Sequence, residues 1–158
     1  MKGLILGRFQ PFHNGHLGMI KWCASRCDEL VIGIGSSNKT RTFKNPFSYD
    51  EREFMIDNSI NLKIPYEFVG IPDFGNGEKW IAWVDDNIKF DFLMSNSKPE
   101  IDIFRDYGFE VRQIEYENKE IRGTQIREMM LEQKDISKFV PPVVAKFVKD
   151  TNLKLIWV

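Results

Sequence analysis

The sequence predicts an α/β domain in which a mostly parallel central sheet of about five strands is flanked by helices, with a small helical C-terminal segment. Two observations support this fold class. Short runs of branched apolar residues, typical of buried parallel strands, alternate with segments whose apolar residues recur at helical spacing. The first strand, helix and second strand fall within residues 2–35, which suits a βαβ unit.

Length and composition favour one domain. A chain of 158 residues with 42% hydrophobic residues can bury a core but has no room for a second catalytic domain. We expect residues 1–130 to form the core of the domain and residues 131–158 to form a helical segment and a tail. With 22 basic and 23 acidic residues the formal net charge is -1, which predicts no general attraction to nucleic acid or to an anionic membrane.

The remaining compositional signals concern location. Two cysteines, Cys23 and Cys27, are too few for a structural zinc site and are expected to be reduced thiols near the core. The first residues lack the pattern of a signal peptide, and no stretch approaches the roughly 18 apolar residues of a membrane span. A cytoplasmic protein is therefore expected.

The first strand, Lys2–Leu6, leads through the stretch Gly7–His16 (GRFQPFHNGH) into a helix that we expect from Leu17. Strand-to-helix turns bind anions in α/β proteins, because the N-terminus of a helix presents unpaired N–H groups and the positive end of its dipole. The stretch is therefore predicted to bind phosphate.

Both histidines of the protein, His13 and His16, lie in this stretch three residues apart, so their side chains can face the same way. Gly15 leaves room between them for a ligand to approach the backbone, and Arg8 adds a positive charge upstream. The alternative for an H-x-x-H pair is two polar turn residues. The neighbouring glycine and arginine favour the functional interpretation.

The second strand is expected at Glu29–Gly35, and the polar loop Ser36–Phe47 follows it. This loop leaves the carboxyl end of a strand, which is where α/β sheets bind ligands. Its basic residues are therefore candidates for phosphate contacts, with a solvated surface loop as the alternative. They are Lys39, Arg41 and Lys44.

A helix is predicted over Tyr49–Ile60, because Ser48 and Glu51 have the spacing of a capping box. The third strand is expected at Tyr66–Ile71 and ends in a turn-rich segment, residues 72–77.

The next segment, Glu78–Val84, has helical spacing and carries two tryptophans. Most tryptophans of a small domain belong to its core. Trp80, however, lies in the first turn after a strand-end loop, whereas Trp83 can face inward. The position of Trp80 favours a ligand contact.

The sheet is completed by a fourth strand at Asp91–Met94 and a fifth at Phe109–Ile114. A helix over Glu100–Tyr107 connects them, and Gly108 is expected to be its C-cap.

Near the end of the chain, Gly123 and Thr124 are expected to begin a helix and to present N–H groups and a hydroxyl to an anion. Arg127, one turn further on, supplies a planar positive group to the same anion. Downstream, helices are predicted at Asp135–Phe139 and Pro141–Lys149. The last residues, Leu153–Val158, form an apolar tail.

These motifs carry a family resemblance. Gly7–His16 resembles the H-x-G-H signature of the nucleotidyltransferase superfamily, in the G-R-F-Q-P-F-H form of archaeal-type nicotinamide-nucleotide adenylyltransferases. Glu120–Met130 resembles the superfamily's I-S-[GST]-T-x-[IV]-R signature, and Asn45–Arg52 matches an N-P-F-[ST]-x-x-E-R block. The resemblance covers essentially the whole chain and implies a Rossmann-like single nucleotidyltransferase domain, with the nucleotide-binding core in residues 1–130.

The activity implied by the resemblance is adenylyl transfer in NAD biosynthesis. The phosphate of nicotinamide mononucleotide (NMN) attacks the α-phosphorus of ATP in line, giving NAD and pyrophosphate. An attacking phosphate is already an anion near neutral pH, so the protein must supply alignment and charge stabilisation rather than a general base. Mg²⁺ is expected to be carried by the ATP phosphates, with no metal ligands from the chain. The implied partners are ATP, NMN, NAD and other copies of the chain, often as a hexamer.

The resemblance also implies roles for individual residues. The catalytic residues are His13, His16 and Arg127. The residues implied to bind ATP or phosphate are Gly7, Arg8, Phe9, Gly15, Lys39, Arg41, Lys44, Asn96, Gly123 and Thr124. The nicotinamide-binding residues are Asp73, Asn76 and Trp80, whose flat ring suits stacking on a pyridine.

Three positions depart from the family pattern. Lys44 replaces an arginine, Ser95 replaces a glycine and Arg122 replaces a serine. The alternatives are a related adenylyltransferase acting on nicotinate mononucleotide, FMN or phosphopantetheine, and a nucleotide-binding module without turnover.

Overall fold

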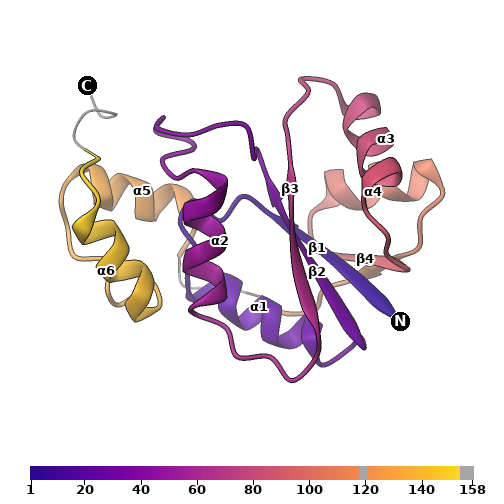
Figure 1. Ribbon diagram of the computed structural model, residues 1–158, viewed down its shortest axis with the longest axis horizontal. Coiled ribbons are helices and arrows are strands. Elements are labelled where there is room, and N and C mark those ends of the chain that lie inside the picture. The colour runs from indigo at the N-terminus through magenta and orange to yellow at the C-terminus, as the bar shows by residue number, and fades with distance from the viewer. Residues whose placement is uncertain (118–120, 154–158) are drawn as a thin grey trace.

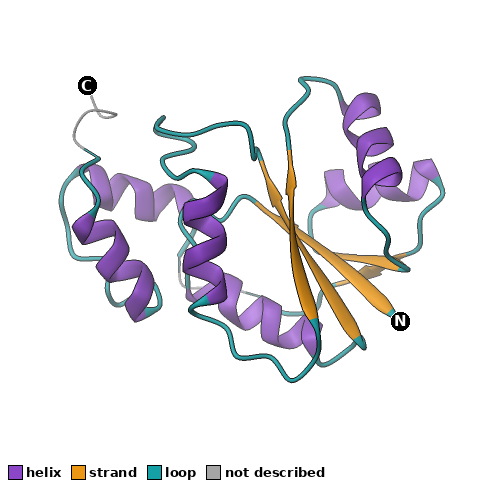
Figure 2. Cartoon of the chain, in the orientation of Figure 1, coloured by secondary structure: helices purple, strands orange, loops and turns teal. Residues whose placement is uncertain are grey.

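The chain folds around one parallel sheet with helices on both of its faces (Figures 1 and 2). The structure, a computed structural model, describes residues 1–117 and 121–153. The strands are β1 (Lys2–Gly7), β2 (Glu29–Gly35), β3 (Tyr66–Ile71), β4 (Phe92–Ser95) and β5 (Val111–Gln113). The helices are α1 (Asn14–Ala24), α2 (Tyr49–Asp57), α3 (Gly77–Asn87), α4 (Lys98–Tyr107), α5 (Gly123–Leu131) and α6 (Pro142–Asp150). In the part of the chain that is described, no helix has the length and apolar character needed to cross a membrane.

The strand order determines where a ligand can bind. The sheet runs β3-β2-β1-β4-β5, and every pairing between neighbours is parallel. From β1 the chain extends the sheet to one side through β2 and β3 and then to the other side through β4 and β5. Open α/β sheets bind ligands at the carboxyl ends of the strands where this direction reverses. In this fold that point lies between β1 and β4.

Alternating side chains of the central strands build two cores. Ile5 and Ile32 belong to the larger core, which is covered by α1, α2 and the C-terminal helices. Leu4 and Val31, their neighbours in sequence, belong to the smaller core under α3 and α4. All four side chains are fully buried, as expected for a sheet covered on both faces.

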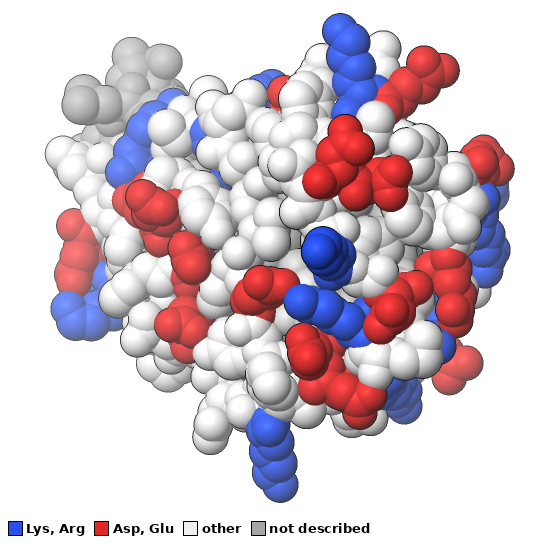
Figure 3. Space-filling view, turned by 45° about the vertical axis from the view of Figure 1, so that its right-hand side comes forward, with Lys and Arg blue, Asp and Glu red and all other residues white. Residues whose placement is uncertain are grey.

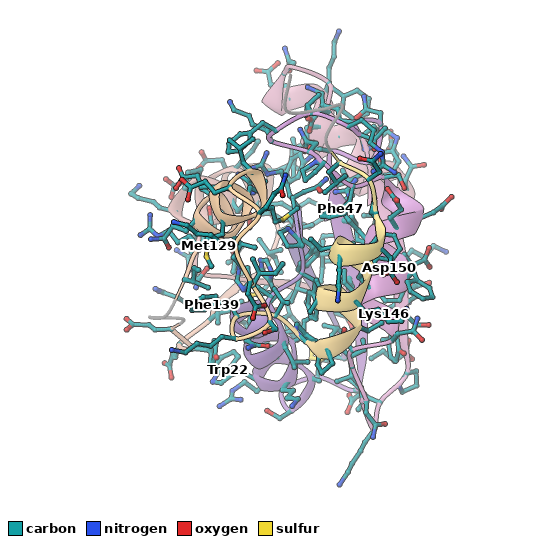
Figure 4. All side chains as sticks on the ribbon, turned by 90° about the vertical axis from the view of Figure 1, so that its left-hand side faces the viewer. Trp22, Phe47, Met129, Phe139, Lys146 and Asp150 are labelled. Atoms are coloured by element: carbon teal, nitrogen blue, oxygen red, sulfur yellow. The ribbon has the colours of Figure 1, made fainter. Side chains whose placement is uncertain are left out.

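Helix α6 packs against α2 on the outside of the larger core (Figure 4). Phe147 of α6 packs on Phe47 and on Phe54 of α2, with ring centroids 6.0 Å apart in each case. The outer surface of α6 is polar, with Lys146 and Asp150 paired at 2.7 Å. The segment after residue 131 therefore completes the larger core.

The predicted capping box at the start of α2 and the predicted glycine C-cap of α4 are both confirmed. The Ser48 hydroxyl accepts a hydrogen bond from the Glu51 N–H (3.2 Å), and the Glu51 carboxylate accepts one from the Ser48 N–H (2.9 Å). Gly108 ends α4 with φ 108°, in the left-handed region that favours glycine.

Several element boundaries differ from the predictions. The helix predicted over Tyr49–Ile60 ends at Asp57, because the Asn58 and Ser59 side chains donate to carbonyls of its last turn. The strand predicted at Phe109–Ile114 is confined to Val111–Gln113.

The helix predicted over Asp135–Phe139 is wrong. The Asp135 carboxylate accepts a hydrogen bond from the Ser137 N–H (2.9 Å), which makes the segment a turn. Of the predicted apolar tail, Leu153 is buried in the larger core, and residues 154–158 lie outside the described residues.

Arg52 ties three parts of the fold together, a role that the sequence did not indicate. Its side chain is fully buried, and the hydrogen bonds of its guanidinium to the described residues all go to backbone carbonyls. The acceptors are Arg8 beyond β1 (2.9 Å), Gly35 (2.6 Å) and Ser36 (3.1 Å) at the end of β2, and Ser48 before α2 (3.1 Å). Burial and the nearby Arg8 guanidinium lower the pKa of Arg52 to about 10, so it remains charged at neutral pH.

Replacing Arg52 is expected to destabilise the fold strongly. Arg52→Ala leaves several strand-end carbonyls buried without donors, so we expect the free energy of unfolding to fall by about 3 kcal/mol or more. Arg52→Lys keeps the charge but loses the planar fork, and should recover only part of this loss. The measurement is urea unfolding, with Arg105→Ala on the exposed surface of α4 as the control. Equal unfolding midpoints for Arg52→Ala and the control would contradict the assigned role.

Candidate active site

The two histidines cap α1 reciprocally. The Nδ1 atom of His13 accepts a hydrogen bond from the His16 N–H (3.3 Å), and the Nδ1 atom of His16 accepts one from the His13 N–H (3.2 Å). Their rings stack with centroids 3.6 Å apart and an interplanar angle of 20°. Because an accepting Nδ1 carries no proton, each neutral ring holds its proton on Nε2. The backbone therefore fixes both tautomers.

The surroundings of the histidines keep them neutral. Burial lowers the pKa of His13 to about 4. Burial, together with the neighbouring His13, lowers the pKa of His16 well below its ordinary value of 6.5. Phe9 and Phe12 enclose His16, with ring centroids at 4.8 and 5.8 Å. Each histidine is thus an uncharged hydrogen-bond donor at neutral pH.

The histidines open into a pocket of about 230 Å³ at the reversal of strand order, which we name the switch-point pocket. The carboxyl ends of β1 and β4 form part of its wall. The structure brings together five of the predicted site residues there: Gly7, His13, Gly15, His16 and Asn96. The rest of the wall is formed by Leu6, Met19, Met94, Ser95, Ser97, Glu100, Ile114 and Tyr116.

Phe9 supports this pocket from behind. It has φ 53°, is 1% exposed and packs edge-on against His16. A Cβ atom on Gly7 would lie 2.6 Å from the Phe9 ring, so a glycine is needed for this turn. Predicted to bind ATP, Phe9 occupies a core position in which its ring orients His16.

Arg127 lies in α5, one turn after its start, and is 5% exposed. Its guanidinium donates to the Gln10 carbonyl (2.9 Å) and to the Thr124 hydroxyl (3.2 Å), while its buried Nε–H has no hydrogen-bond partner in the part of the chain that is described. A Cβ atom on Gly123 would lie 3.2 Å from the same guanidinium. Burial and repulsion from Arg8 lower the pKa of Arg127. An anion bound here would satisfy the free donor and relieve the repulsion.

The positive charge around Arg8 and Arg127 is local. Acidic and basic side chains are interspersed over the face shown in Figure 3, in line with the net charge of -1. Arg8 is exposed, and no carboxylate among the described residues forms an ion pair with it or with Arg127. The exposed guanidinium of Arg8 is therefore available to a ligand, whereas that of Arg127 is buried.

The Gln10 side chain links the turn Gly7–His16 to the loop before α2 by hydrogen bonds. It is 2% exposed, and its side-chain amide both donates to the Phe47 carbonyl and accepts from the Phe47 N–H, each at 2.9 Å. Its own carbonyl holds Arg127. Gln10 belongs to the GRFQPF motif, but its spatial role depends on Phe47, 37 residues away.

The three basic residues of the loop Ser36–Phe47 have different partners. Arg41 is held by the Glu51 carboxylate (2.7 and 2.9 Å) and by the Pro46 carbonyl (2.7 Å). The Nζ atom of Lys39 lies 3.5 Å from the Oδ2 atom of Asp73, within ion-pair distance. Lys44 is exposed and forms no ion pair with a described residue. Neither Arg41 nor Lys44 is among the described residues that line the switch-point pocket.

A second pocket, of about 300 Å³, lies at the start of α3, and we name it the α3 pocket. The predicted residues Asp73, Asn76 and Trp80 all line it, together with Lys39 and Phe74. The side-chain carbonyl oxygen of Asn76 caps α3 by accepting from the Lys79 N–H (3.0 Å). Trp80 packs edge-on against Phe104 of the smaller core, with centroids 5.8 Å apart, while it also lines the pocket.

Two residues that depart from the family pattern differ in exposure: Arg122 is exposed and Ser95 is buried. Arg122 precedes α5 with an exposed side chain, and its N–H donates to the Gln125 side chain (2.8 Å). Ser95 is buried at the end of β4 and donates to Glu100 (3.0 Å). Burial raises the pKa of Glu100, and the Ser95 bond opposes the rise. Glu100 lines the switch-point pocket, and sequence reasoning did not identify it as a site residue.

Comparisons with known proteins identify the family of this chain. Residues 4–129 match the model of the family described as cytidylyltransferase-like. The nicotinamide-nucleotide adenylyltransferase of Methanococcus aeolicus is 35% identical over 155 residues, covering 96% of this chain and 90% of that protein. The enzyme of the same name from Archaeoglobus fulgidus is 36% identical over 161 residues, covering 96% and 92%.

Solved structures share the fold at lower identity. A bifunctional NMN adenylyltransferase/ADP ribose pyrophosphatase from Francisella tularensis superposes with a TM-score of 0.77 at 24% identity, covering 96% of this chain. This chain spans half of that protein's length. A putative nicotinate-nucleotide adenylyltransferase from Vibrio parahaemolyticus gives a TM-score of 0.65 at 16% identity, covering 94% of this chain and 98% of that one.

The predicted α/β class with a parallel five-stranded sheet is confirmed, as is the resemblance noted in the sequence motifs. Family membership follows from a family model that matches most of the chain and from relatives at about 35% identity over nearly the full length of both proteins. The chain belongs to the cytidylyltransferase-like family and, within it, to the nicotinamide-nucleotide adenylyltransferases.

Proposed function

We propose that this chain transfers the adenylyl group of ATP to NMN, giving NAD and pyrophosphate. The observation that carries the proposal is the pair of imidazoles fixed as neutral Nε2 donors at the switch-point pocket. Phosphate oxygens only accept hydrogen bonds at neutral pH. Two preorganised donors stabilise the charge that builds on the triphosphate during attack, at little reorganisation cost.

The phosphates of ATP extend from the histidines toward Arg8 and Arg127. The free Nε–H of Arg127 and its repulsion with Arg8 support this placement, because an anion between the two side chains offsets both costs. Gly123 and Thr124 begin α5 beside them and add N–H donors at a helix N-terminus. Of the basic residues of the loop Ser36–Phe47, Lys44 is exposed and forms no ion pair with a described residue, so we assign it to the leaving pyrophosphate.

The attack needs alignment more than proton transfer. The NMN phosphate is already an anion, so no residue has to remove its proton before it attacks the α-phosphorus in line. Its pyridine ring is assigned to the α3 pocket, where Trp80 offers a flat surface and Asp73 and Asn76 offer polar groups.

A divalent cation enters this scheme with the substrate. Among the described residues, no three histidine, cysteine, aspartate or glutamate side chains are grouped so that they could hold a metal ion. We assign Mg²⁺ to the ATP phosphates and to water, where the cation neutralises phosphate charge. A second structure of the bifunctional enzyme from Francisella tularensis is a complex with AMP and a manganese ion, which supports use of a divalent cation in this fold.

The cellular setting is part of the proposal. Cys23 and Cys27 are free thiols, in keeping with a reducing compartment such as the cytoplasm. The homo-oligomer implied by the family resemblance stays a prediction.

The proposal is tested by incubating the protein with MgATP and one acceptor at a time, and then detecting pyrophosphate and dinucleotide. NAD formation from NMN is expected. Product only with nicotinate mononucleotide, FMN or phosphopantetheine would assign another adenylyltransferase activity, and no product with any acceptor would favour a binding module.

A pair of substitutions separates the two nitrogen atoms of His16. His16→Asn places an acceptor near Nδ1, which preserves the helix cap, but lacks the Nε2 donor. We expect its kcat to fall about 100- to 1,000-fold with stability retained. His16→Gln places a donor near Nε2 and should retain more activity. Equal activity of the wild type and His16→Asn would remove the donor role.

The pKa of His13 predicts a pH-dependent stability. The folded protein holds His13 with a pKa of about 4, below the ordinary 6.5, so the unfolded chain binds more protons as pH falls from 6.5 toward 4. This contribution, about 3 kcal/mol, is present above pH 6.5 and is lost toward pH 4.

Urea unfolding between pH 8 and pH 4.5 measures this loss. His13→Asn is the matched variant, because asparagine is a good N-cap but does not titrate. We expect the unfolding free energy of the wild type to decrease more steeply below pH 6.5 than that of the variant. Parallel curves for the two proteins would contradict the low pKa.

Trp80 is expected to affect the two substrates differently. Trp80→Ala should raise the KM for NMN about tenfold or more, since stacking on a base is worth about 1–3 kcal/mol. The KM for ATP should change little, and Trp80→Phe should recover most of the loss. Steady-state kinetics with each substrate varied in turn provide the measurement. An equal rise in both KM values would indicate a structural role against Phe104 instead.

A further inference from the structure

Glu100 is a half-buried carboxyl group that the proposed mechanism does not use. It is the third residue of α4, and its side chain lines the switch-point pocket together with His13 and His16. No cationic side chain among the described residues forms an ion pair with it. Its one described hydrogen bond comes from Ser95, so the carboxyl retains further acceptor capacity.

Ser95 turns this carboxyl toward the pocket. A glutamate at the third position of a helix ordinarily accepts from the N–H of the N-cap residue. Here that N–H, of Ser97, donates to the Ser95 hydroxyl (3.0 Å), and the hydroxyl donates to Glu100 (3.0 Å). The cap is thus satisfied by Ser95, and Glu100 is left at the wall of the pocket.

The walls of the pocket define what it accepts. The histidines supply donors for phosphate, and the lining also includes Met19, Ile114 and Tyr116, whose side chains offer largely apolar surface to a base. Glu100 supplies an acceptor and therefore requires a ligand group that donates. In a nucleotide, the sugar between phosphate and base carries two adjacent hydroxyls that can donate.

We propose that Glu100 accepts hydrogen bonds from the ribose hydroxyls of the nucleotide in the switch-point pocket, with Ser95 as its positioning residue. This inference rests on the proposed function, because it takes ATP to be the nucleotide. The raised pKa of Glu100 agrees with it: burial without a cation disfavours the carboxylate, and ribose donors offset that cost. Glu100 then makes the site prefer a nucleotide with ribose over one with deoxyribose.

The test is a titration of the full-length protein with Mg²⁺ complexes of ATP, 2′-deoxy-ATP and 3′-deoxy-ATP in a calorimeter. The wild type should bind ATP about tenfold or more tightly than at least one deoxy analogue, as expected for a hydrogen bond to a charged group. Glu100→Ala should lose about tenfold in ATP affinity and bind ATP and the analogues almost equally. Glu100→Gln, which keeps one acceptor, should lie between these limits.

Two further variants separate positioning from folding. Ser95→Ala leaves Glu100 in place but removes its orienting bond, so it should weaken discrimination between ATP and the deoxy analogues by a smaller factor than Glu100→Ala does. Asp102→Asn, an exposed change on the same helix, should leave discrimination unchanged. Urea unfolding of each variant ensures that the affinities compare folded proteins.

The outcomes are distinct. Unchanged discrimination in folded Glu100→Ala and Glu100→Gln overturns the proposal. Loss of discrimination against an ATP analogue without the 6-amino group, with the deoxy ratios intact, also overturns it, because Glu100 would then contact the base. Binding does not depend on turnover: a wild type that discriminates but makes no NAD supports the Glu100 role while contradicting the proposed function. A wild type that fails to bind ATP contradicts both.

Discussion

The guanidinium of Arg52 is the contact on which the functional edge of the sheet depends. Carbonyls at the carboxyl ends of β1 and β2 have no further strand to pair with, and Arg52 supplies their donors from inside the core. Because the acceptors are carbonyls rather than carboxylates, the positive charge is solvated but not neutralised. The same residue thus positions the turn beginning at Arg8 and contributes to the positive potential around it.

In this site, different residues supply directed hydrogen bonds and positive charge. His13 and His16 have low pKa values and a fixed tautomer, so they donate in defined directions without adding charge. Arg8 and Arg127 supply the charge, and no carboxylate among the described residues pairs with them. This division suits a triphosphate, whose oxygens accept hydrogen bonds and whose charge rises during attack. Glu100 also lines the switch-point pocket, and it presents a hydrogen-bond acceptor where the histidines present donors.

Features that depend on neighbours in sequence were largely predictable. The bounds of β2 and β3, the Ser48 capping box and the Gly108 C-cap agree with the predictions, because their signals lie within a few residues. The helix predicted at Asp135–Phe139 was wrong, and here too the cause is local. The Asp135 carboxylate accepts a hydrogen bond from the Ser137 N–H, which stabilises a turn instead of a helix. The roles of Gln10 and Arg52 were missed, because their partners are up to 44 residues away.

The sequence by itself determined the α/β class and the family, and it singled out nine of the residues that line the two pockets, because these follow from apolar periodicity and short motifs. Only the tertiary structure decided the protonation of the histidines, the separation of Arg41 from the pockets and the orientation of Glu100 toward one of them. Burial and competition between hydrogen-bond partners govern these properties. Both depend on which residues meet in space, and no local pattern in the chain contains that information.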